Sequence, residues 1–258
     1  ERLNNMFNSK GIGIESGTFH SICYKILKKN NIISNQTIID EYQQKKIIEG
    51  ITKDSKKAFD MIKHISTAKN CMQSPDDYLG DEDIKSIYKE YEEHLNNNKF
   101  IDFDDLLFIT VKNIKDNDFF SHNISKYYKY ILVDEFQDTN SLQFEILICL
   151  SKRYKNITVV GDIDQSIYGW RFADYKNIDK FKNIYPNYNL YLLEQNYRST
   201  PNIIDYSNRI IEKEKNRLNN RIWTDNSKGL SVKTIPYTDT YTADYLWNHF
   251  LNIKYHIW

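Results

Sequence analysis

The segment that most constrains the fold is residues 131–138, where an apolar run ends directly in two carboxylates, Asp134 and Glu135. A buried parallel strand has this composition, and its carboxyl end places side chains at the edge of a sheet, where nucleotides bind. Apolar runs at 157–161 and 190–193 also lead into polar side chains. The three runs together predict an α/β sheet that binds a nucleotide along one edge.

The composition is typical of a globular protein, since 40% of the 258 residues are hydrophobic. A chain of this length forms one large domain or two smaller ones and can bury a substantial core. The 35 basic and 35 acidic residues cancel, so the net charge neither requires nor excludes a nucleic-acid partner. Any contact with DNA must therefore come from a local patch of the surface.

The cysteines and the apolar segments indicate the compartment. Cys23, Cys71 and Cys149 are odd in number and far apart, and no pair has the CxxC spacing, which argues against disulfides and a zinc site. No apolar run approaches the roughly 18 residues of a membrane helix, and no signal peptide is apparent, so no membrane partner is expected. We expect an intracellular, reducing compartment: the cytoplasm, the nucleus or a DNA-containing organelle.

From residue 130 onward the sequence predicts strands that alternate with helices. The expected elements are strand 130–133, helix 141–152, strand 157–161, helix 174–184, strand 189–193 and helix 201–215. This order implies a parallel sheet with right-handed crossovers. A further strand at 230–235 and a helix at 241–253 predict the beginning of a second α/β domain.

Upstream of residue 130 the sequence is mainly helical in character. Apolar periodicity predicts helices at 18–29 and 102–114, and the polar, mostly helical stretch at 30–99 indicates an insertion. The Gly-Ile-Gly at 11–13 is not a phosphate-binding loop, because no Gly-Lys-Ser or Gly-Lys-Thr occurs in the chain. The chain starts at Glu1 rather than at methionine, so we expect an internal fragment.

Asp134 and Glu135 are the first candidates for chemistry. A strand-terminal aspartate can hold Mg²⁺ against the phosphates of a nucleotide, and a neighbouring glutamate can orient and deprotonate an attacking water. The simpler interpretation is a strand that ends in solvated acids. The continuation Phe-Gln-Asp-Thr at 136–139 argues against it.

Gln165 and Arg198 follow the next two apolar runs. The neutral amide of Gln165 can hydrogen-bond a γ-phosphate or the attacking water, and Arg198 suits a bidentate phosphate contact that lysine cannot copy. Their ordinary interpretations are a loop glutamine and a salt bridge at the start of a helix.

A third group of candidates suits nucleic acid. Tyr168, Trp170 and Arg171 form an aromatic and basic cluster on a polar loop, as expected for stacking on exposed bases. Thr18 and His20 can offer donors to phosphates near a helix start. The alternatives are a tryptophan anchored in the core and a structural histidine.

Five motifs occur in the order found in UvrD/PcrA/Rep-type superfamily-1 DNA helicases, and the chain resembles this family over essentially its whole length. The motifs are TFHS at 18–21, DFDDL at 102–106, VDEFQDTN at 133–140, VGDIDQSIYGWR at 160–171 and LEQNYRST at 193–200. The last three are long and highly specific.

The resemblance implies a RecA-like α/β fold of the P-loop NTPase class, with a parallel sheet and a helical insertion. Residues 1–29 and 100–198 would form the first RecA-like domain, residues 30–99 its insertion, and residues 199–258 the beginning of a second RecA-like domain. The family comprises ATP-driven, Mg²⁺-dependent 3′-to-5′ translocases on single-stranded DNA, used in repair and replication. Its partners are single-stranded DNA, junctions with 3′ tails and possible repair proteins.

The resemblance also implies roles for individual residues. Asp134 would bind Mg²⁺, Glu135 would be the catalytic base, and Gln165 would couple the γ-phosphate to the DNA loop. Tyr197 would pack on the adenine and Arg198 would contact the γ-phosphate. The implied DNA contacts are Thr18, His20, Tyr168, Trp170 and Arg171.

Two departures from the family pattern matter. The Walker-A loop would lie before Glu1 and the later motifs after Trp258, so the isolated chain is expected to lack turnover. Phe172 stands where the family usually has glycine, and a phenylalanine is hard to place if the loop needs a positive φ. The alternatives are a RecB/AddA-type helicase-nuclease, a non-catalytic module that binds single-stranded DNA, and an interaction scaffold.

Overall fold

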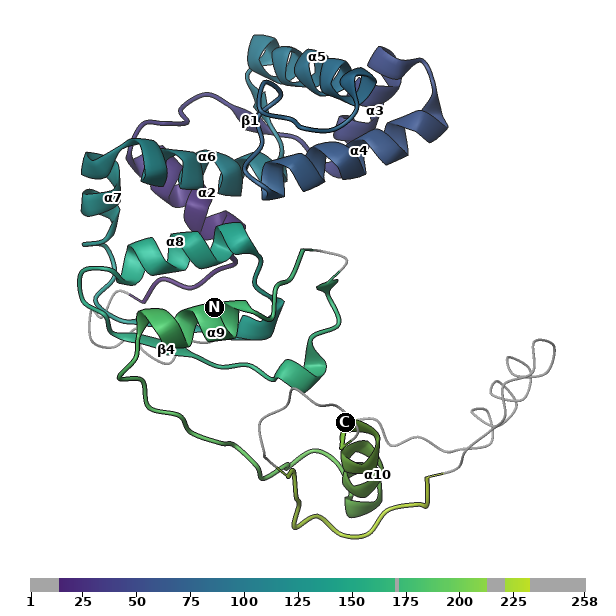
Figure 1. Ribbon diagram of the computed structural model, residues 1–258, viewed down its shortest axis with the longest axis vertical. Helices are drawn as coiled ribbons and strands as arrows, with labels where there is room; N and C mark the ends of the chain where they lie inside the picture. Colours follow the sequence, from purple (N-terminus) through teal and green to yellow (C-terminus); the bar gives the residue numbers. More distant parts are fainter. Residues whose placement is uncertain (1–13, 170–171, 213–220, 233–258) are drawn as a thin grey trace, which may run out of the picture. The chain divides into compact units, whose positions relative to one another are not determined.

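The computed structural model describes residues 14–169, 172–212 and 221–232, and Figure 1 shows the course of the chain. The chain divides into two compact units, residues 1–188 and 189–258. This division comes earlier in the chain than the predicted boundary at residue 198. Each unit is described by itself.

The first unit has a layer of helices that share one core. This layer consists of α2 (Phe19–Lys29), α6 (Phe103–Asp116), α7 (Asp118–Ile124) and α8 (Ser141–Ser151). The predicted helices at 18–29, 102–114 and 141–152 are thereby confirmed. Leu27, Leu107 and Ile146 are among the side chains buried between these helices.

Helix α8 is covered on both sides, which explains its apolar sequence. Leu142, Ile146 and Leu150 belong to the core of the helical layer, whereas Phe144 and Leu147 pack against the sheet and α9 (Asn177–Ile184). A helix that is apolar all round is a buried helix. In Figure 1, α8 accordingly lies between α2 and α9.

Two short strands form the sheet at whose edge the acidic motif lies. β3 (Ile131–Val133) and β4 (Ile157–Val159) pair in parallel, with Val133 opposite Val159. The predicted strands at 130–133 and 157–161 and their parallel pairing are thus confirmed. The backbone N–H of Val160 continues the ladder and donates to the carbonyl of Val133 at 2.8 Å, so the two strands end together at one edge.

The predicted insertion is helical and has a core of its own. α3 (Glu41–Thr52), α4 (Ser55–Asn70) and α5 (Glu82–Asn98) bury side chains that include Ile48, Ile65 and Tyr91. An aspartate caps the N-terminus of each of these helices, at positions 40, 54 and 81, and such side chains satisfy free N–H groups of the first turn. The segment begins and ends at a parallel pair, β1 (Thr37–Ile38) and β2 (Phe100–Ile101).

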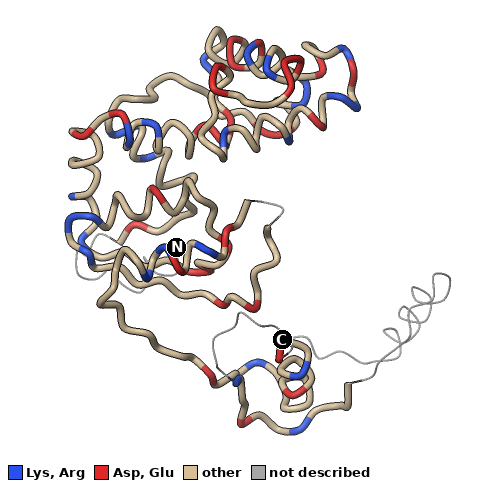
Figure 2. The backbone as a smooth tube through the Cα atoms, in the orientation of Figure 1, with Lys and Arg blue, Asp and Glu red and all other residues tan. Residues whose placement is uncertain are grey.

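Charges of both signs are interspersed along the insertion, as Figure 2 shows. Because acidic and basic groups alternate there, the insertion has no strong field of one sign. The thiols of Cys23, Cys71 and Cys149 are free, and that of Cys71 is exposed. None of the helices in the described ranges has the length and apolar character needed to cross a bilayer.

The second unit is described only in part. α10 (Pro201–Ile211) begins with a proline, which suits the first turn because its missing N–H would have no partner there. The backbone of Trp223 exchanges two hydrogen bonds with the segment at 194–196, at 2.9 and 2.7 Å. α10 confirms the described part of the predicted helix at 201–215.

The predicted strand at 189–193 is wrong. These residues form no strand, and Tyr191 and Leu193 are 80% and 83% exposed. An apolar run becomes a strand only where a neighbouring strand supplies hydrogen-bond partners, and within the described residues the pairing occurs after this run, between Gln195 and Trp223. Residues 230–232 also form no strand, while 233–235 and the predicted helix at 241–253 lie outside the described residues.

Candidate active site

The two candidate carboxylates lie on an acidic loop, residues 134–138, at the end of β3. Val133 is buried, and Asp134 and Glu135 are exposed. Glu135 adopts a left-handed backbone conformation, with a φ of 51°, and η1 (Phe136–Asp138) follows it. Non-glycine residues with positive φ are uncommon and often mark functional turns.

Phe136 anchors the acidic loop in the core. Its side chain is 2% exposed, and its ring lies 5.7 Å from that of Phe181 and 6.3 Å from that of Phe144. Its backbone N–H donates to the carbonyl of Val160 at 2.9 Å. Phe136 therefore fixes the loop to the core, while the carboxylates of Asp134 and Glu135 are exposed to solvent.

The candidate amide lies on the loop after β4, residues 161–165, called here the Gln165 loop. The carboxylate of Asp162 accepts a hydrogen bond from the backbone N–H of Asp164 at 3.0 Å and thereby caps η2 (Ile163–Gln165). It also accepts from the side-chain amide of Gln165 at 2.6 Å. Gln165 is thus exposed but held by Asp162.

Gln137 joins the acidic loop to the Gln165 loop, and the sequence reasoning assigned it no role. Its Nε2 donates to Glu135 Oε2 at 2.8 Å and its Oε1 accepts from the backbone N–H of Asp162 at 3.0 Å. Its position inside the acidic motif could have pointed to this role, because an amide can donate to a carboxylate and accept from the backbone at the same time.

The acidic loop carries carboxylates, the donor type that Mg²⁺ prefers, although among the described residues the acidic side chains that converge closely enough to hold an ion are elsewhere, at Glu92, Asp102 and Asp105. Asp134, Glu135 and Asp138 supply carboxylate oxygens, the ligands that this hard cation prefers. Asp138 Oδ1 is buried without a hydrogen-bond partner. Burial, followed by the nearby charge of Glu135, raises the pKa of the Asp138 carboxyl. A cation would relieve both costs, because it satisfies the oxygen and offsets the negative charge.

Thr18 and His20 lie at the start of α2. Thr18 caps this helix, since its hydroxyl accepts from the N–H of Ser21 at 3.3 Å. The ring of His20 is half-buried and meets Phe103 edge to face at 6.1 Å. Burial lowers the pKa of His20, against the opposing charge of Asp104, and so favours the neutral imidazole.

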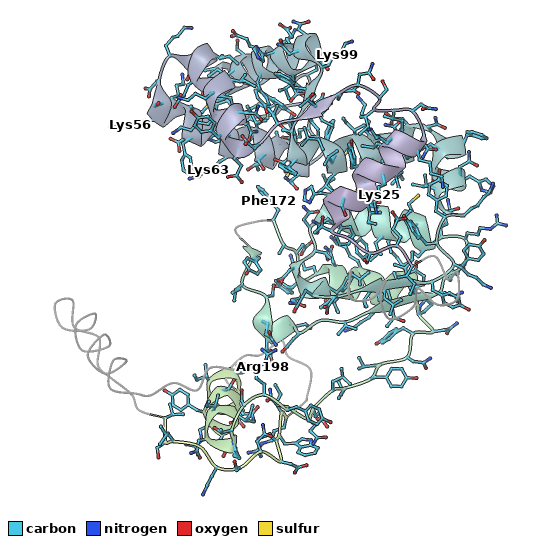
Figure 3. All side chains as sticks on the ribbon, turned by 180° about the vertical axis from the view of Figure 1, so that it is seen from behind. Lys25, Lys56, Lys63, Lys99, Phe172 and Arg198 are labelled. Atoms are coloured by element: carbon cyan, nitrogen blue, oxygen red, sulfur yellow. The ribbon has the colours of Figure 1, made fainter. Side chains whose placement is uncertain are left out.

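The loop after Gln165 carries Tyr168, Trp170 and Arg171 and is called here the aromatic loop, residues 166–172. Its backbone geometry is unusual at Phe172. This residue has a φ of 66°, and its N–H donates to the carbonyl of Gly169 at 3.1 Å. The loop thus takes the positive φ that makes a phenylalanine hard to place. Tyr168 is 38% exposed, whereas Trp170 and Arg171 lie outside the described residues. Figure 3 labels Phe172.

Phe172→Gly is expected to leave the chain about 1 kcal/mol more stable than Phe172→Ala, as measured by urea unfolding. Both variants remove the ring, but only glycine relieves the left-handed backbone, which costs an ordinary residue roughly 1–2 kcal/mol. Phe172→Ala is thus the matched control for lost packing. An alanine variant as stable as the glycine variant would show that the turn is unstrained.

Tyr197 and Arg198 belong to the second unit. Tyr197 is 78% exposed and its hydroxyl donates to Gln195 Oε1 at 2.7 Å. The backbone N–H of Arg198 donates to Asn196 Oδ1 at 2.9 Å. Arg198 is exposed and is labelled in Figure 3. Contacts of these two side chains with a nucleotide stay a prediction.

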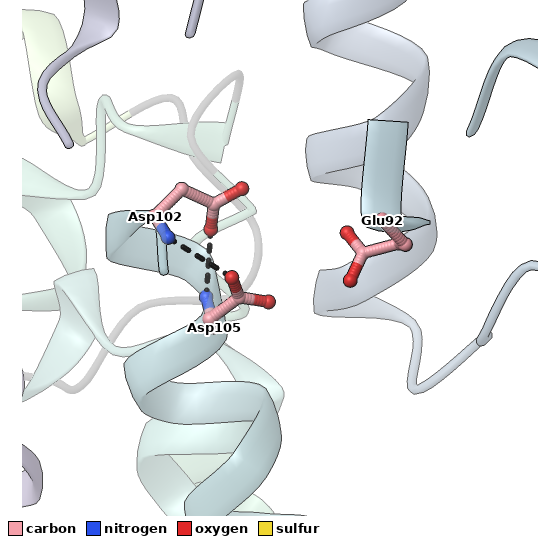
Figure 4. A group of neighbouring side chains, drawn as sticks. All are labelled: Glu92, Asp102 and Asp105. Atoms are coloured by element: carbon pink, nitrogen blue, oxygen red, sulfur yellow. Dashed lines mark hydrogen bonds between the residues drawn. The ribbon is translucent and has the colours of Figure 1, made fainter. Parts of the chain in front are cut away.

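A second acidic group lies where the insertion meets α6. Glu92, Asp102 and Asp105, drawn in Figure 4, approach closely enough to hold a metal ion. However, Lys69 Nζ lies 2.8 Å from Glu92, 2.7 Å from Asp102 and 2.6 Å from Asp105. The ammonium takes the place that a cation would occupy, so this group holds the fold together.

The chain is similar to known proteins. Residues 1–186 match the UvrD/REP helicase N-terminal domain family. A protein of Bacillus subtilis strain 168 named ATP-dependent DNA helicase PcrA is 36% identical over 248 residues, 90% of this chain and 34% of the relative. Proteins of the same name from Leuconostoc citreum and Staphylococcus epidermidis are 37% identical, over 82% and 90% of this chain. The chain spans about one third of the length of these relatives.

Proposed function

The chain belongs to the UvrD/REP helicase family, and on this premise we propose that it is part of an ATP-dependent DNA helicase. The enzyme would move 3′ to 5′ along single-stranded DNA in repair or replication. The observation that carries the proposal is the bridge between the acidic loop and the Gln165 loop through Gln137. It joins a candidate base to a candidate phosphate sensor, as a nucleotide-driven motor requires.

The acidic loop would perform the hydrolysis. Asp134 would hold Mg²⁺, which neutralises charge on the phosphates of ATP when it is bound. Glu135 would orient a water and take its proton. Gln165 would hydrogen-bond the γ-phosphate or that water. Tyr197 would contact the adenine and Arg198 the γ-phosphate, and the planar guanidinium suits a phosphate.

Single-stranded DNA would run past the start of α2 and the aromatic loop. Tyr168 and Trp170 would stack on bases, with Arg171 nearby, and stacking of this kind tolerates any base sequence. Thr18 and the neutral His20 would donate hydrogen bonds along the same path. The substrates would include junctions with 3′ tails, in an intracellular reducing compartment, with repair proteins as further partners.

The predicted domains also become part of the proposal. Residues 1–29 and 100–198 would form a first RecA-like domain, residues 30–99 its insertion, and residues 199–258 the beginning of a second. The separate core of α3, α4 and α5 supports the insertion, and the parallel pairing of β3 with β4 supports the RecA-like sheet.

In the whole helicase of which the chain is proposed to be a part, Glu135→Gln is expected to lower DNA-stimulated ATP hydrolysis by about 10²–10⁴-fold, the usual contribution of a general base. Phosphate release would be measured with Mg²⁺ and ATP, with and without a single-stranded oligonucleotide. Equal DNA-stimulated turnover by the wild type and by Glu135→Gln would contradict the assignment of the base.

Binding provides a second measurement that does not depend on turnover. A fluorescent oligonucleotide should bind the chain with an affinity that falls as salt rises, because phosphate contacts release counterions. Tyr168→Ala should weaken this binding by about 1–3 kcal/mol, the contribution of one stacked base. A chain that neither binds the oligonucleotide nor hydrolyses ATP would overturn the proposed function.

A further inference from the structure

We propose that Gln137 is a positioning residue that holds Glu135 and the Gln165 loop in one arrangement. It would make Glu135, the base that deprotonates the attacking water, sensitive to the position of Gln165. The inference rests on the proposed function for its consequence, but the bridge itself is a property of the fold. No sequence-based assignment gave Gln137 a role.

The contacts of Gln137 fix the orientation of its amide. The side chain is 1% exposed. Nε2 donates to the carboxylates of Glu135 at 2.8 Å and Asp138 at 3.3 Å, and Oε1 accepts from the N–H of Asp162 at 3.0 Å. Rotating the amide by half a turn would set its oxygen against two carboxylates and its NH₂ against an N–H. The partners therefore allow a single orientation.

Gly161 makes room for this bridge. A Cβ at this position would lie 2.6 Å from Gln137 Oε1 and 3.1 and 3.2 Å from the backbone nitrogens of Phe136 and Gln137. The first of these separations is closer than a real Cβ contact, so any side chain at 161 would displace the amide. The close approach of the two loops, rather than an unusual φ, is what requires glycine here.

Asp162 extends the bridge to Gln165. Its backbone N–H is held by Gln137, while its carboxylate accepts from Gln165 Nε2 at 2.6 Å. The polar path thus runs from Glu135 through Gln137 and Asp162 to Gln165. A shift of Gln165 toward or away from a phosphate would reach Glu135 through three consecutive contacts, each of them short and specific.

The chemistry at position 137 is specific to an amide. A glutamate would place a third carboxylate against Glu135 and Asp138, and like charges at this distance repel. A methionine would fill nearly the same volume but could neither donate to Glu135 nor accept from Asp162. Gln137→Met therefore removes the bridge while it preserves the packing of the loop.

Transmission along the path can be measured by NMR on the chain without nucleotide or DNA. Glu135→Ala is expected to shift the side-chain amide resonance of Gln165 in the wild-type background. In the Gln137→Met background the same substitution should leave that resonance unmoved. Gly161→Ala, which keeps the glutamine but displaces it, should also abolish the effect. The resonance dispersion of each variant checks that it is folded.

A matched control is Gln73→Met. Gln73 is half-buried, and its hydrogen bond to Tyr88 is made by its backbone carbonyl, which the substitution retains. The shift at Gln165 should persist in this background. A shift that also persists in Gln137→Met, or that is missing from the wild type, would overturn the proposal.

Hydrolysis then separates this inference from the proposed function. Gln137→Met is expected to lower kcat for ATP by about 10²-fold with little change in KM, because a misplaced catalytic group costs about this factor. This measurement is made in the whole helicase of which the chain is proposed to be a part; if its wild type hydrolyses no ATP, the proposed function is in question while the NMR result on the chain still decides the bridge. An unchanged kcat beside a lost NMR coupling would overturn the catalytic consequence alone.

Discussion

Replacing Lys69 with methionine is expected to destabilise the first unit by about 3–5 kcal/mol, the usual cost of removing one partner from a buried ion pair. The Lys69 side chain is 1% exposed and lies within 2.8 Å of three carboxylate groups. Methionine preserves the length of the side chain but leaves these carboxylates without a counter-charge.

The position of Lys69 makes the effect cooperative. Lys69 comes from α4, Glu92 from α5, and Asp102 and Asp105 from the start of α6. The two aspartates also cap α6, since each carboxylate accepts the backbone N–H of the other at 2.9 Å. Loss of the ammonium would therefore loosen the insertion and the first turn of α6 together.

The loss should depend on pH. Burial raises the pKa of the Asp105 carboxyl, against the opposing charge of Lys69. Burial also opposes ionisation of Asp102, but the charge and hydrogen bond of Lys69 lower its pKa overall. Without Lys69 both carboxyls would bind protons more tightly in the folded than in the unfolded chain, so stability would fall as pH rises. The variant should lose more stability at about pH 8 than at about pH 5.

Urea unfolding followed by circular dichroism measures this effect. Lys56→Met, on the exposed first turn of the same helix (Figure 3), is the control and should change stability by no more than about 0.5 kcal/mol. A loss below about 1 kcal/mol in Lys69→Met would mean that water or protonation relieves the carboxylates, against the buried geometry.

The helices could be predicted from the sequence, whereas the role of Lys69 could not. Apolar periodicity is local, and it predicted α2, α6 and the helical character of residues 30–99. A lysine on a polar helix reads as a solvated residue, because its three partners come from two other helices. Only tertiary contacts distinguish it from its exposed neighbours.

The candidate site shows the same limit. The alternation of strands and the motifs predicted where Asp134, Glu135 and Gln165 lie relative to β3 and β4. The bridge by Gln137 depends on the left-handed turn at Glu135 and on the close approach of Gly161, which no spacing reveals. The wrong strand at 189–193 has a related cause, since strand formation depends on a partner elsewhere in the chain.

Phe136→Ala is expected to cost about 3–5 kcal/mol of stability, the range for truncating a buried phenylalanine. The ring is 2% exposed and packs on Phe144 and Phe181, so alanine would leave a cavity under the acidic loop. Phe136→Leu fills most of this space and should cost less than about half as much. Phe119→Ala, at a ring that is 76% exposed, should change stability by no more than about 0.5 kcal/mol.

Phe136→Ala should also disturb the candidate active site, because Phe136 lies between Glu135 and Gln137 in the sequence. Without the Phe136 ring, the backbone hydrogen bond from Phe136 to Val160 should weaken. The protons of the Gln137 side-chain amide should then exchange with solvent faster in Phe136→Ala than in Phe136→Leu. If Phe136→Ala loses the expected stability but the amide exchange of Gln137 stays unchanged, the acidic loop is held by its backbone alone. Concerted loss of both would show that the core positions Glu135 through a single buried ring.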